Sequence, residues 1–204
     1  QTTDAFVGVR NSRLVLIDDH GVRATMTASW LIQMGWNEVY VFEGALESVK
    51  WADEIVVVDS HSADQTVALA GRYAARIVVH DWAGYSAQRN YAAEIASHDW
   101  ILAIDADERV PTALAAEIQR IMREGSEVGG YRMPRVSYYL GRWIRGTDWY
   151  PDYQLRLYDR RVGRFNGKRV HESVELKQGR PGTLEHDLQH YPYRDISDHV
   201  TSID

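Results

Sequence analysis

The chain of 204 residues contains no cysteine, and this absence excludes several kinds of chemistry. Disulfide bonds, thiolate nucleophiles and cysteine-ligated zinc sites all need this residue, although its absence leaves the redox compartment open. No stretch approaches the ~20 consecutive apolar residues of a membrane-spanning helix, and no signal peptide is visible, so we expect a soluble protein. Because the chain begins at Gln1 rather than Met and stops at Asp204 within an amphipathic segment, we also expect a fragment.

Positive charge is scarce, because 23 Lys and Arg residues stand against 29 Asp and Glu residues, for a formal net charge of -6. This balance argues against a general nucleic-acid-binding protein. The cations that exist are concentrated, together with Tyr and Trp, in one stretch: Arg132, Arg135, Arg142, Arg145, Arg156, Arg160, Arg161, Arg164, Lys168 and Arg169. This stretch either suits an anionic acceptor or forms amphipathic strands whose arginines face solvent.

An apolar run from Trp100 to Ile104 leads directly into three acids, Asp105, Asp107 and Glu108. Such a run predicts a parallel strand that is buried on both faces, and open α/β sheets bind ligands beyond the carboxyl ends of such strands. Two carboxylates two residues apart could both turn toward one point and bind Mg²⁺ or Mn²⁺ on a diphosphate. The alternative is a solvated turn followed by a helix from Glu108 to Glu124, with acids in its first turn.

Two earlier segments end in the same kind of polar residue. The run Glu54 to Asp59 predicts a buried strand that ends in an acid, followed by a polar turn and a helix from Thr66 to Ala75. After a further strand, Arg76 to His80, a helix running to about Ala96 carries Arg89 near its start. A cation beside free backbone amides favours an anion there, whereas the alternative is an ordinary surface arginine.

The first 44 residues form a separate pattern. They predict a strand from Arg13 to Ile17, a helix from Val22 to Met34 and a strand from Glu38 to Phe42. The segments LVLIDDHGVRA, ASWL and VYVFEG resemble the end of a rhodanese domain. In rhodaneses the first strand ends at a nucleophilic cysteine, a position that Asp18 holds here. A carboxylate carries no persulfide, so we expect a βαβ scaffold piece rather than a sulfurtransferase.

From residue 45 to residue 204 the chain resembles glycosyltransferase family 2. The resemblance is closest to the branch that builds lipopolysaccharide core, the β-1,4-glucosyltransferase-like proteins. It rests on linked motifs in a fixed order: VVVDSxSxDxT from Val56, QRN from Gln88, DxDE from Asp105, YPDYQLRLY from Tyr150, VHE from Val170 and HYxYR from His190. The resemblance implies a GT-A-like fold, which is a mostly parallel sheet flanked by helices, and an inverting transferase that uses a UDP-sugar, with glucose as the expected sugar.

The resemblance also implies roles for single residues on the donor side. Asp59 would contact the uracil or ribose, Arg89 and Asp105 would hold the nucleotide, and Asp107 would ligate a divalent metal, Mg²⁺ or Mn²⁺, on the diphosphate. His171 would be a further metal ligand or contact the acceptor, unless it is a structural histidine.

On the acceptor side, Asp152 is the candidate base. Inversion needs a carboxylate that removes the hydroxyl proton as the acceptor oxygen attacks the anomeric carbon opposite the departing UDP. The alternative is a turn acid that follows Pro151. The resemblance implies a glycan or lipid-linked acceptor and a cytoplasmic location, at the inner face of a bacterial membrane with peripheral contact to it.

The chain departs from the family pattern at its start. Family members open with a strand, a loop over the nucleotide base and a full helix, and this opening is absent before Leu46. We therefore expect a chimeric domain in which the strands of the rhodanese-like piece, including Leu14 to Ile17 and Val39 to Phe42, continue the sheet. An inactive α/β scaffold or binding module is the alternative function, and a sulfurtransferase accessory module is a third.

Overall fold

A computed structural model of the chain describes residues 3–7, 12–17, 39–62, 65–73, 75–168 and 172–192. Its elements, in chain order, are β1 (Thr3–Val7), β2 (Ser12–Ile17), α2 (Val39–Ser48), β3 (Ile55–Asp59), α3 (Thr66–Arg72), β4 (Arg76–Val79), α4 (Tyr85–Ile95), β5 (Trp100–Asp105), β6 (Glu108–Arg109), α5 (Thr112–Glu124), β7 (Gly130–Tyr139), β8 (Arg142–Ile144), the 3-10 helix η1 (Thr147–Trp149), β9 (Asp152–Asp159), β10 (Gly163–Phe165), β11 (Val174–Leu176), β12 (Gly182–Thr183) and β13 (Leu188–His190).

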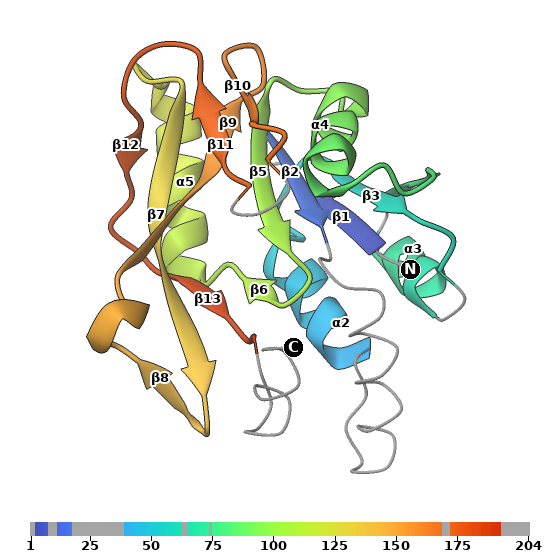
Figure 1. The fold of residues 1–204 in the computed structure, drawn as a ribbon, viewed down its shortest axis with the longest axis horizontal. Coiled ribbons are helices and arrows are strands. Elements are labelled where there is room, and N and C mark those ends of the chain that lie inside the picture. Colours follow the sequence, from blue (N-terminus) through green and yellow to red (C-terminus); the bar gives the residue numbers. More distant parts are fainter. Residues whose placement is uncertain are drawn as a thin grey trace.

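The main sheet is mixed. Among the described residues it has eleven strands in the order β4-β3-β1-β2-β5-β9-β7-β13-β6, with β8 and β12 also paired to β7 (Figure 1). Strands β3 and β4 are parallel, and β2 pairs in parallel with both β3 and β5. Strands β9 and β7 continue the sheet in antiparallel pairing. Strand β1 lies between β3 and β2 and pairs antiparallel with both, and β13 pairs in parallel with β7. The sheet therefore has a mostly parallel half and a mostly antiparallel half, which meet at the β5–β9 pair; we call them the parallel and the antiparallel half.

Most of the predicted strands are confirmed. Strands β3, β4 and β5 match the runs expected from hydrophobicity, and β2 continues the same sheet, as predicted for Leu14 to Ile17. The strand predicted over Val39 to Phe42 is wrong, because these residues form the first turns of α2. Their β-branched and aromatic side chains favour a strand locally, but the helix continues into Ala45, Leu46 and Val49, which are fully buried at helical spacing.

The helix α5 begins later than the alternative interpretation of the acids predicted, which was a solvated turn followed by a helix from Glu108. It starts at Thr112, directly after Pro111, and Glu108 lies in the short strand β6 that pairs with β13. A proline disfavours helical backbone in the residue before it, which helps to keep the helix from starting earlier. Glu108 is buried, so that alternative is wrong for this residue.

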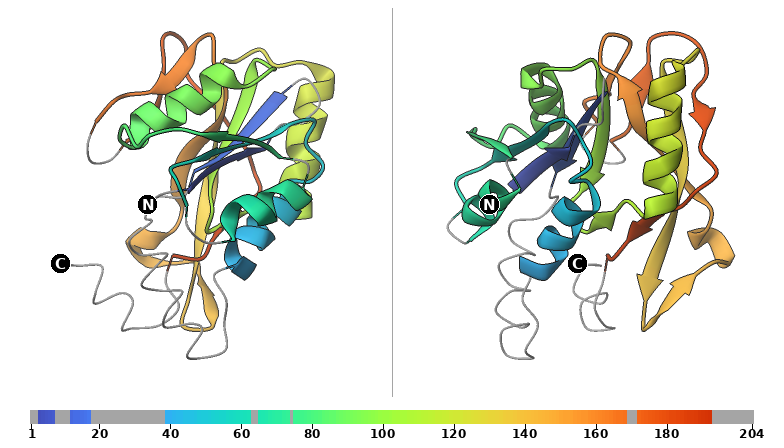
Figure 2. Two further views of the ribbon diagram at one scale, coloured as in Figure 1. Left: turned by 90° about the vertical axis from the view of Figure 1, so that its right-hand side faces the viewer. Right: turned by 180° about the vertical axis from the view of Figure 1, so that it is seen from behind.

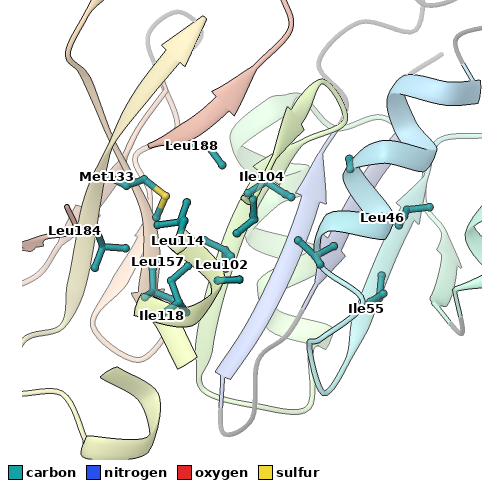
Figure 3. Close-up of a cluster of buried hydrophobic side chains, with 14 of the residues drawn as sticks. Leu46, Ile55, Leu102, Ile104, Leu114, Ile118, Met133, Leu157, Leu184 and Leu188 are labelled. Atoms are coloured by element: carbon teal, nitrogen blue, oxygen red, sulfur yellow. The ribbon is translucent and has the colours of Figure 1, made fainter. Parts of the chain in front are cut away.

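Helices cover both faces of the sheet (Figure 2). One hydrophobic cluster joins the sheet to α2, α3 and α5; Figure 3 shows its centre, including Leu46, Leu102, Leu114 and Leu157. A second cluster joins the opposite face to α4. Packing on both faces fixes where each parallel strand ends, and so fixes the positions of the polar residues that follow.

Two groups of predictions lie outside the described residues. These are the rhodanese-like helix over Val22 to Met34 with Asp18 before it, and His171. The rhodanese-like assignment therefore stays a prediction. Within the described part of the chain, no helix has both the length and the apolar character needed to cross a lipid bilayer.

Candidate active site

The two strand-end acids lie at the same edge of the sheet, as predicted. Strand β2 is parallel to β3 and to β5, and its last residue pairs with Asp105. Two consecutive residues of α4 then connect both strand ends. The Gln88 side chain donates to Ser60 Oγ at 2.8 Å, and Arg89 Nη2 donates to Asp105 Oδ1 at 2.9 Å. The start of α4 thus lies across the carboxyl ends of β3 and β5.

Asp59 is almost completely buried, with 2% of its surface exposed. Its Oδ2 accepts a hydrogen bond from the Ser62 backbone at 3.0 Å. Its Oδ1 has no hydrogen-bond partner in the described structure. A buried carboxylate oxygen without a donor is costly, so this atom is suited to a donor on a ligand.

A chain of alternating charges runs along the seam between the two halves of the sheet. Arg89 contacts Asp105 and lies 3.6 Å from Glu172. Arg156 Nη2 bridges Asp105 at 2.5 Å and Glu108 at 2.9 Å. Arg135 continues the chain from Glu108, at 3.2 Å, to Asp152, at 2.7 Å. In order, the members of this charge network are Glu172, Arg89, Asp105, Arg156, Glu108, Arg135 and Asp152.

The network shifts the ionisation of its buried members. Burial by itself raises the pKa of Asp105, but the guanidinium groups of Arg156, Arg89 and Arg135 outweigh it and hold this pKa at about 2, below the usual 3.8. Burial alone would lower the pKa of Arg156, whereas Asp105 and Glu108 raise it overall. Asp105 is therefore a fixed anion and Arg156 a fixed cation at neutral pH.

The two aspartates of the DxD motif have different surroundings. The Asp105 side chain is 14% exposed and contacts two arginines, whereas the Asp107 side chain is 38% exposed. Asp107 Oδ2 lies 3.4 Å from His190 Nε2, and His190 Nδ1 lies 3.1 Å from Ser137 Oγ. Across residues 43–62, 65–73, 75–168 and 172–192, no three His, Asp or Glu side chains are grouped so that they could hold a metal ion by themselves.

Asp152, the candidate base, is held by three donors. Arg135 Nε and Nη2 both donate to its Oδ2, at 2.9 and 2.7 Å, and Gln154 donates to Oδ1 at 2.7 Å. The side chain remains 36% exposed. Glu172, which lies at the other end of the network, is 13% exposed and lies 3.6 Å from Arg89.

Sequence reasoning missed four residues of this site: Glu108, Arg135, Arg156 and His190. Arg156 gave a usable signal, since it interrupts the apolar run from Leu155 to Tyr158, and an arginine buried in a strand needs an acid partner. Arg89 also differs from the surface alternative, because it is only 3% exposed. The pairing of Arg135 with Glu108 depends on strands that are far apart in the sequence, so it gave no local signal.

Comparisons with known proteins point to one family. The model of "Glycosyl transferase family 2" matches residues 36–174. The lipopolysaccharide core biosynthesis glycosyltransferase LpsC of Rhizobium meliloti is 32% identical over 160 residues, which cover 74% of this chain and 59% of that protein. An uncharacterized glycosyltransferase of Rickettsia bellii is 48% identical over 86 residues, which cover 42% of this chain and 29% of that protein.

Among solved structures, S. aureus TarS (residues 1–349) in complex with UDP-GlcNAc is similar with a TM-score of 0.41 and 22% identity, over 50% of this chain and 32% of that chain. The alignments with curated relatives thus span less than two thirds of those proteins, 59% of LpsC and 29% of the Rickettsia bellii protein.

Proposed function

The chain belongs to glycosyl transferase family 2, and we propose that it transfers a sugar, with inversion, from a UDP-sugar to a cell-envelope glycan of the lipopolysaccharide-core kind. The similarity to LpsC supports the acceptor class, and the family supports the nucleotide-sugar donor. Glucose is the sugar that we propose, on the resemblance of the sequence motifs.

One observation carries this proposal most strongly, the position of Asp59, Arg89 and Asp105 at one sheet edge. Asp59 offers an unpaired buried acceptor, which suits an N–H of uracil or a ribose hydroxyl. Arg89 lies beside Asp105 at the ends of the parallel strands, where α/β sheets bind ligands. These three residues would hold the nucleotide.

Asp107 and His190 are the residues that fit a divalent metal. Asp107 projects with partial exposure beyond the network, and His190 lies at its carboxylate. Mg²⁺ commonly takes one or two protein carboxylates and completes its shell with phosphate oxygens and water. When bound, Mg²⁺ or Mn²⁺ would neutralise the charge of the departing diphosphate. His171 stays a proposed second ligand outside the described residues.

Asp152 is the proposed general base for the acceptor hydroxyl. It is partly exposed, and strand pairing with Arg135 places it in the same region of the sheet as Glu108. Three hydrogen bonds already hold the Asp152 carboxylate in place, from Arg135 and Gln154, whereas Glu172 lies at the other end of the charge network beside Arg89. Glu172 is therefore the second candidate for this role.

The proposal is tested by calorimetric titration of the chain with UDP in the presence and absence of Mn²⁺. We expect saturable binding that requires Mn²⁺ and that weakens at least about tenfold in Asp107→Ala, since a metal ligand is lost. Glu124→Ala is the matched control, because Glu124 is an exposed acid at the end of α5 and its removal should leave binding unchanged.

A parent chain that binds no UDP would overturn the transferase proposal. The alternative function, an inactive binding scaffold, is favoured by one specific observation, which is that Arg89 is already neutralised by Asp105 and Glu172. Retained stability together with absent UDP binding would then identify such a scaffold.

A further inference from the structure

The hairpin formed by β7 and β8 projects from the rest of the sheet. It extends past β13 on the side where β5 ends and β6 begins (Figure 1), and the same projection is visible from behind (Figure 2). Tyr138 pairs with Trp143, Tyr139 pairs with Arg142, and Leu140 and Gly141 form the turn. We call residues 137–149, which include η1, the aromatic hairpin.

The base of the aromatic hairpin is continuous with the candidate active site. The ring centroids of Tyr138 and Trp143 lie 5.0 Å apart, and they lie 5.7 and 5.4 Å from the ring of Tyr191. The backbone N–H of Tyr191 donates to the carbonyl of Asp107 at 2.9 Å. Because side chains alternate along a strand, these rings lie on one face of the hairpin, and Tyr139 and its partner Arg142 lie on the other face together with Ser137. Ser137 contacts His190 at 3.1 Å, and His190 lies 3.4 Å from Asp107. A ligand on the face with Tyr139 and Arg142 would therefore lie on the same side as the residue proposed to hold the metal.

The outer part of the aromatic hairpin combines aromatic surface with positive charge. Trp149 is 36% exposed. Arg142 is exposed and makes no ion pair with any residue from 43 to 192 that the structure describes, whereas Arg145 is paired to Asp187 at 2.7 Å. The proposed donor residues offer no comparable cation, because Arg89 is buried against acids. The aromatic hairpin thus presents a guanidinium that has no ion-pair partner among the described residues, next to the rings of Tyr139 and Trp149, whose centroids lie 5.6 Å apart.

This combination has a definite ligand chemistry. Aromatic rings present a broad apolar surface on which the C–H face of a sugar can pack, while a guanidinium binds carboxylate or phosphate through paired hydrogen bonds. We propose that the aromatic hairpin binds the acceptor glycan, and that the bound part of the acceptor carries a carboxylate or a phosphate. The inference rests on the proposed function, because the donor side must supply the sugar that this acceptor receives.

Saturation-transfer NMR on the full chain tests the inference with three probes: methyl β-glucuronide, glucose 6-phosphate and the neutral methyl β-glucoside. We expect the anionic probes to bind more tightly than the neutral one, and Arg142→Gln to weaken only the anionic probes, by roughly threefold to fivefold, the factor for an exposed charge pair. Trp149→Ala should weaken all three probes. Arg123→Gln, which removes an exposed arginine from α5, should weaken none.

Two results would overturn the inference. One is equal binding of the neutral and anionic probes in the parent and in Arg142→Gln. The other is absence of probe binding together with sedimentation on vesicles of phosphatidylethanolamine and phosphatidylglycerol that Leu140→Ser abolishes. Leu140 is 49% exposed at the tip, so the latter result would identify a membrane contact instead.

The UDP titration keeps the two proposals separate. UDP binding without binding of any glycoside would reject the acceptor site and leave the transferase proposal intact. Arg142-dependent binding of the anionic probes without UDP binding would support the glycan site and reject the transferase proposal.

Discussion

The parallel half of the sheet is held mainly by apolar packing, whereas the antiparallel half contributes arginines to the candidate active site. In the parallel half, Val56, Val57 and Val58 are at most 1% exposed, and helices cover both faces of their strand. In the antiparallel half, β7 carries Arg135, which contacts Asp152 on the neighbouring strand β9, and β9 carries Arg156, which contacts Asp105 on the neighbouring strand β5. Apolar packing thus positions the strands that end in Asp59 and Asp105 in the parallel half, and Arg156 of the antiparallel half neutralises Asp105.

The seam between the halves is electrostatic as well as hydrogen-bonded. Asp105 is the last residue of β5, and Arg156 comes from β9, which pairs antiparallel with β5. An ion pair at this seam contributes net stability only if its geometry compensates for the lost hydration. Here Arg156 serves two acids, and Glu108 also accepts the backbone N–H of Asp105 at 2.9 Å. The seam is therefore where substitutions should distinguish the two halves most clearly.

The largest expected effect concerns catalysis by the antiparallel half. If Asp152 is the base, Asp152→Asn should lower turnover by about 10²–10⁴, the usual contribution of a positioned general base, while Mn²⁺-dependent UDP binding stays nearly unchanged. The measurement is sugar transfer under saturating donor, with UDP titration as the binding control. If Asp152→Asn kept full turnover and Glu172→Gln lowered turnover by about 10²–10⁴ instead, Glu172 would be the general base.

The second largest expected effect is on the free energy of unfolding, when the charge at the junction of the two halves is removed. Arg156→Met keeps the volume but leaves Asp105 and Glu108 buried with one cation fewer, so we expect a loss of about 3–5 kcal/mol in the free energy of unfolding. Arg123→Met is the matched control, because Arg123 is an exposed arginine in the last turn of α5 and the same change there should cost less than about 1 kcal/mol. Urea denaturation of both variants measures this difference. Equal losses would mean that the seam is held by packing alone.

The parallel half could be predicted from sequence because its rule is local. A strand that is buried on both faces is apolar along its whole length, so β3 and β5 were recognisable, and the acids that follow them marked the ligand-binding edge. The same reasoning failed at Val39 to Phe42, where β-branched residues form a helix because the neighbouring turns bury Ala45 and Leu46. Local preference there gave way to tertiary packing.

The charge network could be predicted only in part, because its rule is not local. Asp105 and Asp107 are both aspartates and lie only two residues apart. Asp105 nevertheless contacts two arginines, whereas Asp107 contacts a histidine from β13. Which acid turns inward depends on Arg156, which lies 51 residues further along the chain. His190 likewise reaches Asp107 only through the pairing of β13 with β6.

Lowering the pH should reduce the free energy of unfolding by a smaller amount, through protonation of Asp105. The pKa of Asp105 is about 2 when folded and near 3.8 when unfolded, so the folded state holds this proton more weakly. The corresponding stability, about 2 kcal/mol, is present above pH 4 and is lost as the pH falls toward 2. Denaturation of the parent and of Asp105→Asn across this range measures it, and the variant should lose less stability. Identical pH dependence in both proteins would contradict the assignment.

The smallest expected effect lies outside the seam, on the exposed face of α5. Arg120 Nη1 lies 2.9 Å from Glu124 Oε2, one helical turn away, and both side chains are more than half exposed, at 55% and 60%. Water and salt screen such a pair, so Arg120→Gln should lower the free energy of unfolding by only about 0.3–0.5 kcal/mol. Urea denaturation at low and high salt checks this, because the small loss should shrink as salt is added, whereas the loss in Arg156→Met should persist since its partners are buried. A loss above about 1 kcal/mol that does not change with salt would contradict this prediction. It would mean that the solvent exposure of an ion pair in this protein does not determine how much the pair contributes to the free energy of unfolding.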